Sequence, residues 1–275
     1  RAAASQERIN EFLKEVPEIL NPSIESFDIG GDVCFNKVSF VYSDTGIRAI
    51  DKLSFSLKEG QTLGVIGKIG SGKSTLAELL CRINDPINGE ITIGSETINK
   101  VNLNDLRSAI GYVPQESFLF SDTIYNNIAF GTKNATEQDV IRASKSAGIF
   151  DNIMQFKDKF ETLIGERGVT LSGGQKQRIS IARALVRNPK IMLFDDCLSA
   201  VDTETEELIL QNIKAESVDK TTLIISHRAS SLKHADKIIV LDSGMIREQG
   251  THKELLDLEG EYFEIYKKQL SESQA

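Results

Sequence analysis

The feature that most constrains this chain of 275 residues is a glycine-rich loop between a short apolar stretch and a helix. The stretch 61–66, QTLGVI, predicts a strand, and a helix is expected from about Lys73 to Arg82. Between them stands Gly67-Lys68-Ile69-Gly70-Ser71-Gly72-Lys73-Ser74, which fits the pattern G-x-x-x-x-G-K-[ST]. Glycines let the backbone N–H groups point inward, and the helix start adds positive potential. The pattern therefore predicts a phosphate-binding loop in an α/β protein.

The residue types of this loop also predict individual roles. The Lys73 ammonium is expected to reach the β- and γ-phosphates of a nucleotide, and the Ser74 hydroxyl is expected to ligate Mg²⁺. Backbone N–H groups and neighbouring side chains would complete the cradle. The predicted nucleotide-binding residues of this segment are Gly67, Lys68, Gly70, Ser71, Gly72, Lys73, Ser74 and Thr75.

A second acidic element follows a short apolar run. Residues 191–194 read IMLF and are followed by Asp195 and Asp196. A carboxylate at the end of a buried strand is suited to hold Mg²⁺ through water beside bound phosphates. Together with the glycine-rich loop, this predicts Asp195 as a nucleotide and metal contact.

Composition excludes several other classes of protein. Lys and Arg number 32 against 40 Asp and Glu, a net charge of −8, which argues against a nucleic-acid partner. The three cysteines form no CxxC pair, so neither a disulfide framework nor a zinc site is expected. No apolar run approaches the roughly 18 residues that would predict a membrane span. The start at Arg1 rather than Met predicts a fragment of a longer protein.

Hydrophobic spacing predicts the order of the elements. A helix with one apolar face is expected over 1–20, followed by a linker over 21–32 and β structure over 33–57. Helices without strands are expected between Phe118 and Arg187, and amphipathic helices over 251–270. The further strands are predicted at 90–93, 110–113, 190–194, 221–225 and 237–241. Short apolar strands alternating with helices favour a mostly parallel sheet covered on both faces.

The sequence Leu171-Ser172-Gly173-Gly174-Gln175 precedes a predicted helix, which Ser172 is expected to cap. LSGGQ, combined with the phosphate loop and the acidic strand end, resembles the nucleotide-binding domain of ATP-binding cassette (ABC) transporters over essentially the whole chain. The resemblance implies an α/β fold: a P-loop NTPase (RecA-like) core with an antiparallel β subdomain and an inserted α-helical signature subdomain. The implied regions are a linker helix at 1–28, the domain at 29–270, its core at about 29–115 and 189–250, a helical subdomain at about 116–188, and C-terminal helices at 251–270.

The same resemblance implies further site residues. Tyr42 stands where an aromatic residue stacks on adenine, and Gln115 resembles the Q-loop glutamine, which touches Mg²⁺ and the attacking water. Ser199 and Asp202 belong to a segment similar to the D-loop, and His227 resembles the switch histidine that contacts the γ-phosphate. The implied catalytic residues are Asp196, His227 and Gln115, and the implied Mg²⁺ ligands are Ser74, Gln115 and Asp195. The implied contacts with ATP bound to a partner are Leu171, Ser172, Gly173, Gly174 and Gln175.

Several segments resemble exporter-type cassettes. These are residues 116–131, the stretch 165–168 (GERG) before the signature, and the opening helix. The resemblance implies a second nucleotide-binding domain as partner, and a transmembrane domain on the N-terminal side of the same full-length chain. The domain would then lie at the cytoplasmic face of the membrane. ATP would be held between the phosphate loop of one domain and the signature of the other, and ATP-driven dimerisation would power export.

One position departs from the family pattern. Asp196 stands where the family usually has a catalytic Glu, and its side chain is shorter by one methylene, about 1.5 Å. Displacing a catalytic group by about 1 Å lowers a rate on the order of 100-fold. We favour a subunit of a heterodimer with a slow site of its own that lends its signature to a faster partner site. A homodimer that works with Asp, an engineered change, an ATP-dependent dimerisation switch and a non-transport ABC ATPase are the alternatives.

Overall fold

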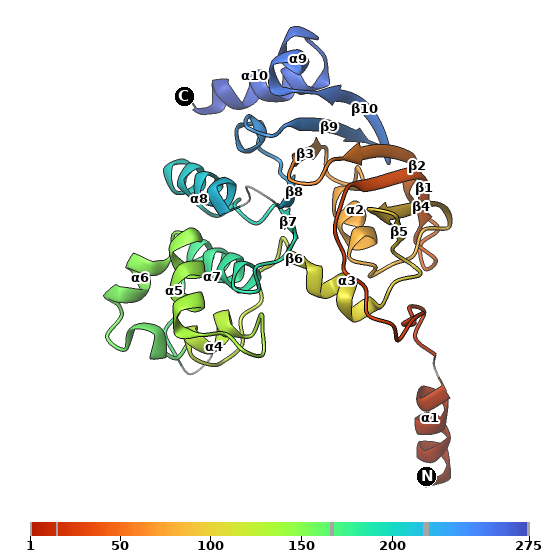
Figure 1. The fold of residues 1–275 in the computed structure, drawn as a ribbon, viewed down its shortest axis with the longest axis vertical. Coiled ribbons are helices and arrows are strands. Elements are labelled where there is room, and N and C mark those ends of the chain that lie inside the picture. The colour runs from red at the N-terminus through yellow and green to blue at the C-terminus, as the bar shows by residue number, and fades with distance from the viewer. Residues whose placement is uncertain (1, 15, 166–167, 217–219, 274–275) are drawn as a thin grey trace.

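The computed structural model describes residues 2–14, 16–165, 168–216 and 220–273. Two sheets and the helices around them form the molecule, with α1 (Ala2–Lys14) extending away from the rest (Figure 1). Glu166 and Arg167, which belong to the exporter-like stretch 165–168, lie outside the described residues. In the described part, no helix combines the length and apolar character that crossing a bilayer requires.

The first sheet has four antiparallel strands in the order β2-β1-β4-β5. On β2, buried and exposed residues alternate toward its end, as expected for a strand with one face on a core. Phe35 and Phe55, which are cross-strand partners, stack with ring centroids 4.6 Å apart. The strands are β1 (Val33–Val41), β2 (Arg48–Leu57), β4 (Asn88–Ile93) and β5 (Glu96–Thr97).

The second sheet has six strands in the order β10-β9-β3-β8-β7-β6. Its strands are β3 (Thr62–Gly67), β6 (Ile110–Val113), β7 (Ile191–Asp195), β8 (Thr221–Ile225), β9 (Lys237–Asp242) and β10 (Met245–Gly250). The pairs from β6 to β9 are parallel, and β10 pairs with β9 in the antiparallel direction. All five residues of β7 and of β8 are buried, because helices and the first sheet cover both faces.

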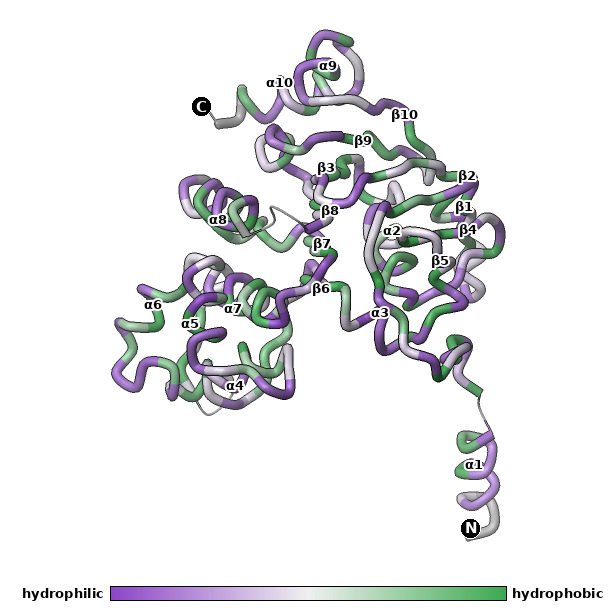
Figure 2. Tube along the Cα trace, viewed as in Figure 1, coloured by the Kyte–Doolittle hydropathy of each residue, from purple (hydrophilic) through white to green (hydrophobic). Residues whose placement is uncertain are grey.

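Helices lie on both sides of this sheet. Helix α2 (Lys73–Leu80) and α3 (Leu103–Ala109) lie beside the antiparallel strands, and α4 to α7 form a lobe next to β6 and β7 (Figure 1). In Figure 2 these lobe helices alternate between hydrophobic and hydrophilic residues, as helices with one buried face do. The remaining elements are α4 (Ile124–Ala129), α5 (Glu137–Ser146), α6 (Phe150–Gln155), η1 (Lys159–Glu161), α7 (Gly173–Leu185), α8 (Thr203–Glu216), η2 (Ala229–Leu232), α9 (His252–Asp257) and α10 (Glu261–Ser273).

Strand β7 separates two hydrophobic cores. Met192 and Phe194 belong to the core shared with the helical lobe, whereas Ile191 and Leu193 belong to the core shared with the antiparallel sheet and α2. Successive side chains of a strand point to opposite faces, so one strand serves both cores. The end of β7, which carries Asp195, is therefore held firmly from two sides.

The predicted fold class is confirmed, and some element predictions were wrong. The first helix ends at Lys14 rather than near residue 20, because Pro17 disfavours a helical backbone just before it. Helices α3 and α8 and the strands β5 and β10 were not predicted. The residues of β10 are half-buried or exposed, so this edge strand lacks the apolar run on which the prediction depended.

Candidate nucleotide site

The phosphate loop leaves the end of β3 and leads into α2. Gly70 and Gly72 have φ angles of 78° and 99°, in the left-handed region that glycine adopts without strain. A Cβ on Gly72 would lie 2.3 Å from the carbonyl oxygen of Ala49, so this position accepts glycine alone. Gly72 precedes the first helical residue, Lys73, and no side chain caps the helix. The first N–H groups of α2 are thus left for an anion.

Two side chains of the loop also suit phosphate. The Lys73 ammonium donates to the carbonyl oxygens of Gly67 and Lys68, both at 2.8 Å. Burial lowers the pKa of Lys73, and the charges of Asp196 and Asp195 oppose that shift. The Ser71 hydroxyl is buried and has no hydrogen-bond partner among the described residues. A buried donor without an acceptor costs free energy, and a phosphate oxygen would supply that acceptor.

The acidic end of β7 faces the loop. Asp195 is 3% exposed, and burial raises its pKa, with a further rise from Asp196. A hydrogen bond from Ser74 and the charge of Lys73 oppose that rise. The serine hydroxyl and the carboxylate thus form a pair of oxygen ligands of the kind that Mg²⁺ prefers. Among the described residues there is no group of three or more His, Cys, Asp and Glu side chains able to hold a metal, so Mg²⁺ here would need phosphate oxygens and water as well.

Asp196 and His227 meet because β7 and β8 are parallel neighbours whose carboxyl ends lie at the same edge. The Asp196 N–H donates to the carbonyl oxygen of Ile225 at 2.9 Å. Its Oδ1 accepts from the backbone N–H of His227 at 3.3 Å. Asp196 has φ of 45°, unusual for a residue with a side chain, and such strain is found where a site is held by its surroundings.

The LSGGQ segment lies at the start of α7, in the helical lobe. Ser172 Oγ accepts from the Gln175 N–H at 3.2 Å, and Gln175 Oε1 accepts from the Ser172 N–H at 2.9 Å, which together form a capping box. A Cβ on Gly174 would lie 2.9 Å from the carbonyl oxygen of Ala200. In the parts of the chain that the structure describes, no hydrogen bond or ion pair joins this segment to the phosphate loop.

The segment 199–202 connects the signature helix to the acidic strand end. Gln177, on α7, donates to Ser199 Oγ at 3.3 Å and accepts from the Ala200 N–H at 3.1 Å. Ser199 Oγ in turn donates to the carbonyl oxygen of Asp196 at 3.1 Å. Asp202 Oδ1 accepts from the N–H of Thr205 in the first turn of α8. Hydrogen bonds with the backbone and the side chain of Thr205 lower the Asp202 pKa.

Comparison with known proteins agrees with this arrangement. Residues 50–199 match the sequence profile of the family described as "ABC transporter". The chain is 44% identical, over 98% of its length, to the probable multidrug resistance ABC transporter ATP-binding/permease protein YheI of Bacillus subtilis.

The chain belongs to the ABC transporter family.

Further relatives indicate the exporter type. The multidrug resistance-like ATP-binding protein MdlA of Escherichia coli is 42% identical over 99% of this chain. The solved structure of a bacterial Atm1-family ABC exporter with ATP bound superposes with a TM-score of 0.92 at 39% identity, over 97% of this chain. The chain spans 46% of YheI, 46% of MdlA and 47% of the exporter structure. It is therefore an ABC-type ATP-binding domain of the exporter type.

One further residue implied by the ABC resemblance, Tyr42, is tied to the helix that follows the phosphate loop. The Tyr42 hydroxyl is 2.9 Å from Thr75 Oγ1 and donates to Glu78 Oε2 at 3.1 Å, which ties its half-buried ring to α2 directly behind the phosphate loop. Burial raises the Tyr42 pKa, so its hydroxyl stays protonated. Gln115 is exposed in a bend just after β6.

Sequence reasoning missed three residues that the fold brings to the site. The hydroxyl of Tyr112, on β6, hydrogen-bonds Asp195, and burial is the main cause of its raised pKa. Glu261 pairs with Lys68, and Gln269 bonds the backbone around His227; both belong to α10. Tyr112 was interpreted as part of an apolar strand, and no local pattern marks two polar residues of a C-terminal helix.

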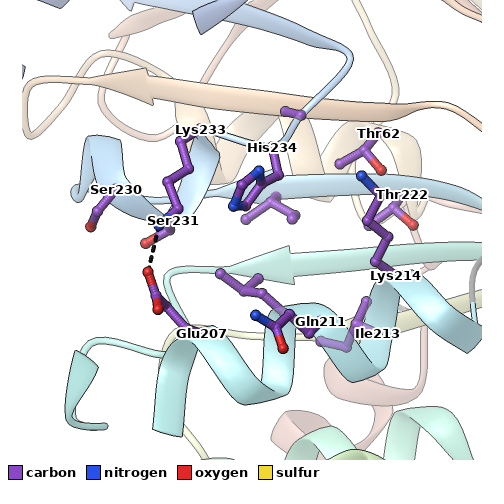
Figure 3. A pocket seen from close by; sticks show the side chains of 13 residues that line it. Thr62, Glu207, Gln211, Ile213, Lys214, Thr222, Ser230, Ser231, Lys233 and His234 are labelled. Carbon is purple, nitrogen blue, oxygen red and sulfur yellow. Dashed lines mark hydrogen bonds and ion pairs between the residues drawn. The ribbon is translucent and has the colours of Figure 1, made fainter. Parts of the chain in front are cut away.

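A separate cavity of about 100 Å³ lies beyond the segment that carries His227, between η2 and α8 (Figure 3). Apolar side chains including Leu210 and Ile224 line it, and Lys233, directly after η2, pairs with Glu207 on α8 at 2.5 Å. None of the predicted nucleotide contacts lines this cavity. This pocket is therefore separate from the phosphate site.

Proposed function

We propose that this domain powers export across a membrane by ATP-driven dimerisation with a second nucleotide-binding domain, and that its own ATP site turns over slowly. The names of the relatives, "ATP-binding/permease" and "ABC exporter", support a transmembrane domain on the same full-length chain, and with it a place at the cytoplasmic face. That the chain spans less than half of these relatives supports the same assignment.

The proposed binding mode follows from the loop and the acidic strand end. Lys73, the uncapped start of α2 and the Ser71 hydroxyl would bind the phosphates of ATP, and Tyr42 would stack on the adenine. Ser74, Asp195 and Gln115 would hold Mg²⁺, which neutralises charge on the phosphates when bound. His227 would contact the γ-phosphate and hold its position through the bond to Asp196.

The proposed role of the signature depends on its separation from the chain's own loop. Ser172 is exposed, and the capping box presents its hydroxyl at the N-terminus of a helix of 13 residues. Such a helix start binds an anion well, so Leu171 to Gln175 would contact the γ-phosphate of ATP held by a partner. A partner with an intact catalytic Glu would then hydrolyse its ATP with this help, while the site described here remains slow.

The observation that most supports slow turnover at this site is the presence of Asp196. Its carboxylate is buried and accepts from the His227 N–H, and its side chain is one methylene shorter than Glu. An attacking water placed for a Glu would lie about 1.5 Å beyond its reach. Binding, which depends on the phosphate loop and Asp195, is expected to be retained. An ATP-dependent dimerisation switch without useful turnover is the second candidate, favoured by this same residue.

Phosphate release and calorimetry test the proposal with three variants. The wild-type chain should bind MgATP and release phosphate slowly, and Asp196→Glu should release it at least about 10-fold faster. Lys73→Ala should weaken ATP binding at least about 10-fold, whereas Lys133→Ala, at an exposed turn between α4 and α5, should leave it unchanged. Fast turnover by the wild type with no gain from Asp196→Glu would refute the slow site. Dimerisation with ATP but no phosphate release by either protein would favour the switch.

A further inference from the structure

The C-terminal helix α10 holds the backbone on both sides of Arg228, in the segment that carries the switch histidine. Gln269 Nε2 donates to the carbonyl oxygen of His227 at 2.6 Å, and Gln269 Oε1 accepts from the N–H of Ala229 at 2.8 Å. Ala229 is fully buried, so its N–H has no access to water. One amide group thus satisfies a donor and an acceptor that no carboxylate or ammonium could satisfy together.

The other end of α10 lies against the phosphate loop. Glu261, its first residue, pairs with Lys68 at 3.2 Å. Glu248 on β10 accepts from the N–H groups of Glu261 and Tyr262, at 2.5 and 3.0 Å, and so anchors the start of the helix. An open cleft is lined by Lys68 of the loop, His227, and α10 residues that include Gln269. A single helix therefore spans from the phosphate loop to the switch segment.

The opposite side of the switch segment is held by Arg228 and by the turn that follows it, where the Ser231 hydroxyl donates to Glu206. Arg228 donates to the carbonyl oxygens of Ser199 and Val201 and to Glu206, which fixes Arg228 itself to the D-loop segment. The following turn, η2, packs on α8 with the cavity of about 100 Å³ between them (Figure 3). The segment is therefore held from both sides, by α10 and by α8 with the D-loop segment.

We propose that Gln269 is a positioning residue for the proposed γ-phosphate contact, setting the place of His227 through its backbone. The inference rests on the role proposed above for His227. The imidazole can meet a phosphate only where the backbone directs it, and the bonds to Asp196 and Gln269 fix that backbone from two neighbouring elements. Movement of α10 would then shift the switch histidine, so this helix connects the C-terminal end of the chain to the proposed catalytic edge.

Hydrogen exchange of backbone amides, measured without nucleotide, tests whether Gln269 holds the backbone at His227 and Ala229. In the 275-residue chain, Gln269→Ala should speed exchange at Ala229 by at least about 10-fold, because its N–H loses its acceptor. Gln269→Glu keeps an acceptor for that N–H and loses the donor to His227, so it should preserve protection at Ala229. Lys267→Ala, an exposed change on the same helix, is the control and should leave exchange unchanged. Unchanged exchange at Ala229 in Gln269→Ala would show that Gln269 does not hold this backbone.

Turnover then tests the positioning role, measured in the Asp196→Glu background where the rate is expected to be higher. Gln269→Ala and Gln269→Glu should each lower kcat about 10-fold with little change in KM, and Lys267→Ala should alter neither. An unchanged kcat with faster exchange would overturn the positioning role. If the Asp196→Glu background itself shows no turnover, the proposed function fails, and hydrogen exchange with ATP tests the positioning role instead. Equal ATP-induced protection of the His227 segment in Gln269→Ala and wild type would overturn the positioning role. Loss of that protection in Gln269→Ala would support it.

Discussion

At the scale of single residues, the site concentrates negative charge where water is scarce. Asp195 and Asp196 are adjacent and both buried, and Lys73 is the nearby cation that offsets them. Burial raises the pKa of Asp195 and lowers that of Lys73, which means that each charged form is held at a cost to folding. A metal ion bound beside the carboxylates, or a phosphate bound beside Lys73, would offset this cost, so the ligand-free domain is less stable than a domain without these charges would be.

Asp195→Asn is therefore expected to stabilise the ligand-free chain and to weaken Mg²⁺-dependent ATP binding. The folded-state pKa of Asp195 lies above its value of 3.8 in the unfolded chain, so its ionised form destabilises the fold at neutral pH. This cost disappears as the pH falls through the folded pKa toward 3.8. Thermal unfolding should show a higher midpoint for Asp195→Asn at pH 7.5 and a smaller difference at pH 5.

Calorimetry on the same variant, with and without Mg²⁺, separates the effect of the substitution on metal binding from its effect on stability. The variant should lose the Mg²⁺ dependence of ATP binding although it unfolds at a higher temperature. A lower midpoint at pH 7.5, or a difference that grows as the pH falls, would contradict the pKa argument.

At the scale of elements, α5 and α7 begin with the same N-terminal capping motif. Thr136 with Asp139, and Ser172 with Gln175, each form a capping box in the helical lobe. Only the second lies in the LSGGQ segment, with two glycines that allow close approach to Ala200. The pair therefore offers a matched comparison between a cap that stabilises a helix and a cap proposed to touch a partner's ATP.

Ser172→Ala and Thr136→Ala are expected to destabilise the chain alike and to differ in dimerisation. Loss of a capping hydroxyl costs about 1 kcal/mol, which lowers the unfolding midpoint by about 2–4 °C in a chain of this size. Gel filtration with MgATP should show weaker dimer formation for Ser172→Ala and an unchanged dimer for Thr136→Ala. Equal dimerisation of the two variants would count against the proposed signature contact.

At the scale of the whole molecule, two of the three cysteines report on the two cores separately. Cys81 belongs to the core around α2 and Cys197 to the core of the helical lobe, and both are buried, whereas Cys34 on β1 is half-buried. Burial raises the pKa of Cys81 to about 12 and also raises that of Cys197. The thiolate, which is the reactive form, is therefore scarce at both buried positions.

Alkylation of the folded chain at pH 8 should modify Cys34 first. At a pKa of about 12, only about one Cys81 thiol in ten thousand is ionised at this pH, so Cys81 and Cys197 should react only as the molecule opens. Mass spectrometry with increasing urea measures each site. If Cys81 and Cys197 become reactive at the same urea concentration, the two cores unfold together, as their shared strand β7 predicts. Rapid modification of either cysteine without urea would contradict their burial in the structure.

The motifs that are contiguous in the chain were predictable from the sequence. The phosphate loop, the run that ends at Asp195 and the cap at Ser172 are each defined by neighbours within a few residues, and local backbone geometry follows from residue type. The inserted helices between β6 and β7 were predictable for the same reason, because their apolar spacing is local. Polar β10 carried no such pattern and was missed.

What the sequence determined by itself was the chemistry of the loop and the class of fold, since glycines and a lysine at those spacings suit a phosphate and a carboxylate at a strand end suits its metal ion. Only the tertiary structure decided how distant residues meet. Asp196 and His227 are 31 positions apart, and His227 and Gln269 are 42 apart, yet each pair forms hydrogen bonds. The order of parallel strands and the docking of α10 create these contacts, and both depend on burying two cores at once rather than on any local pattern.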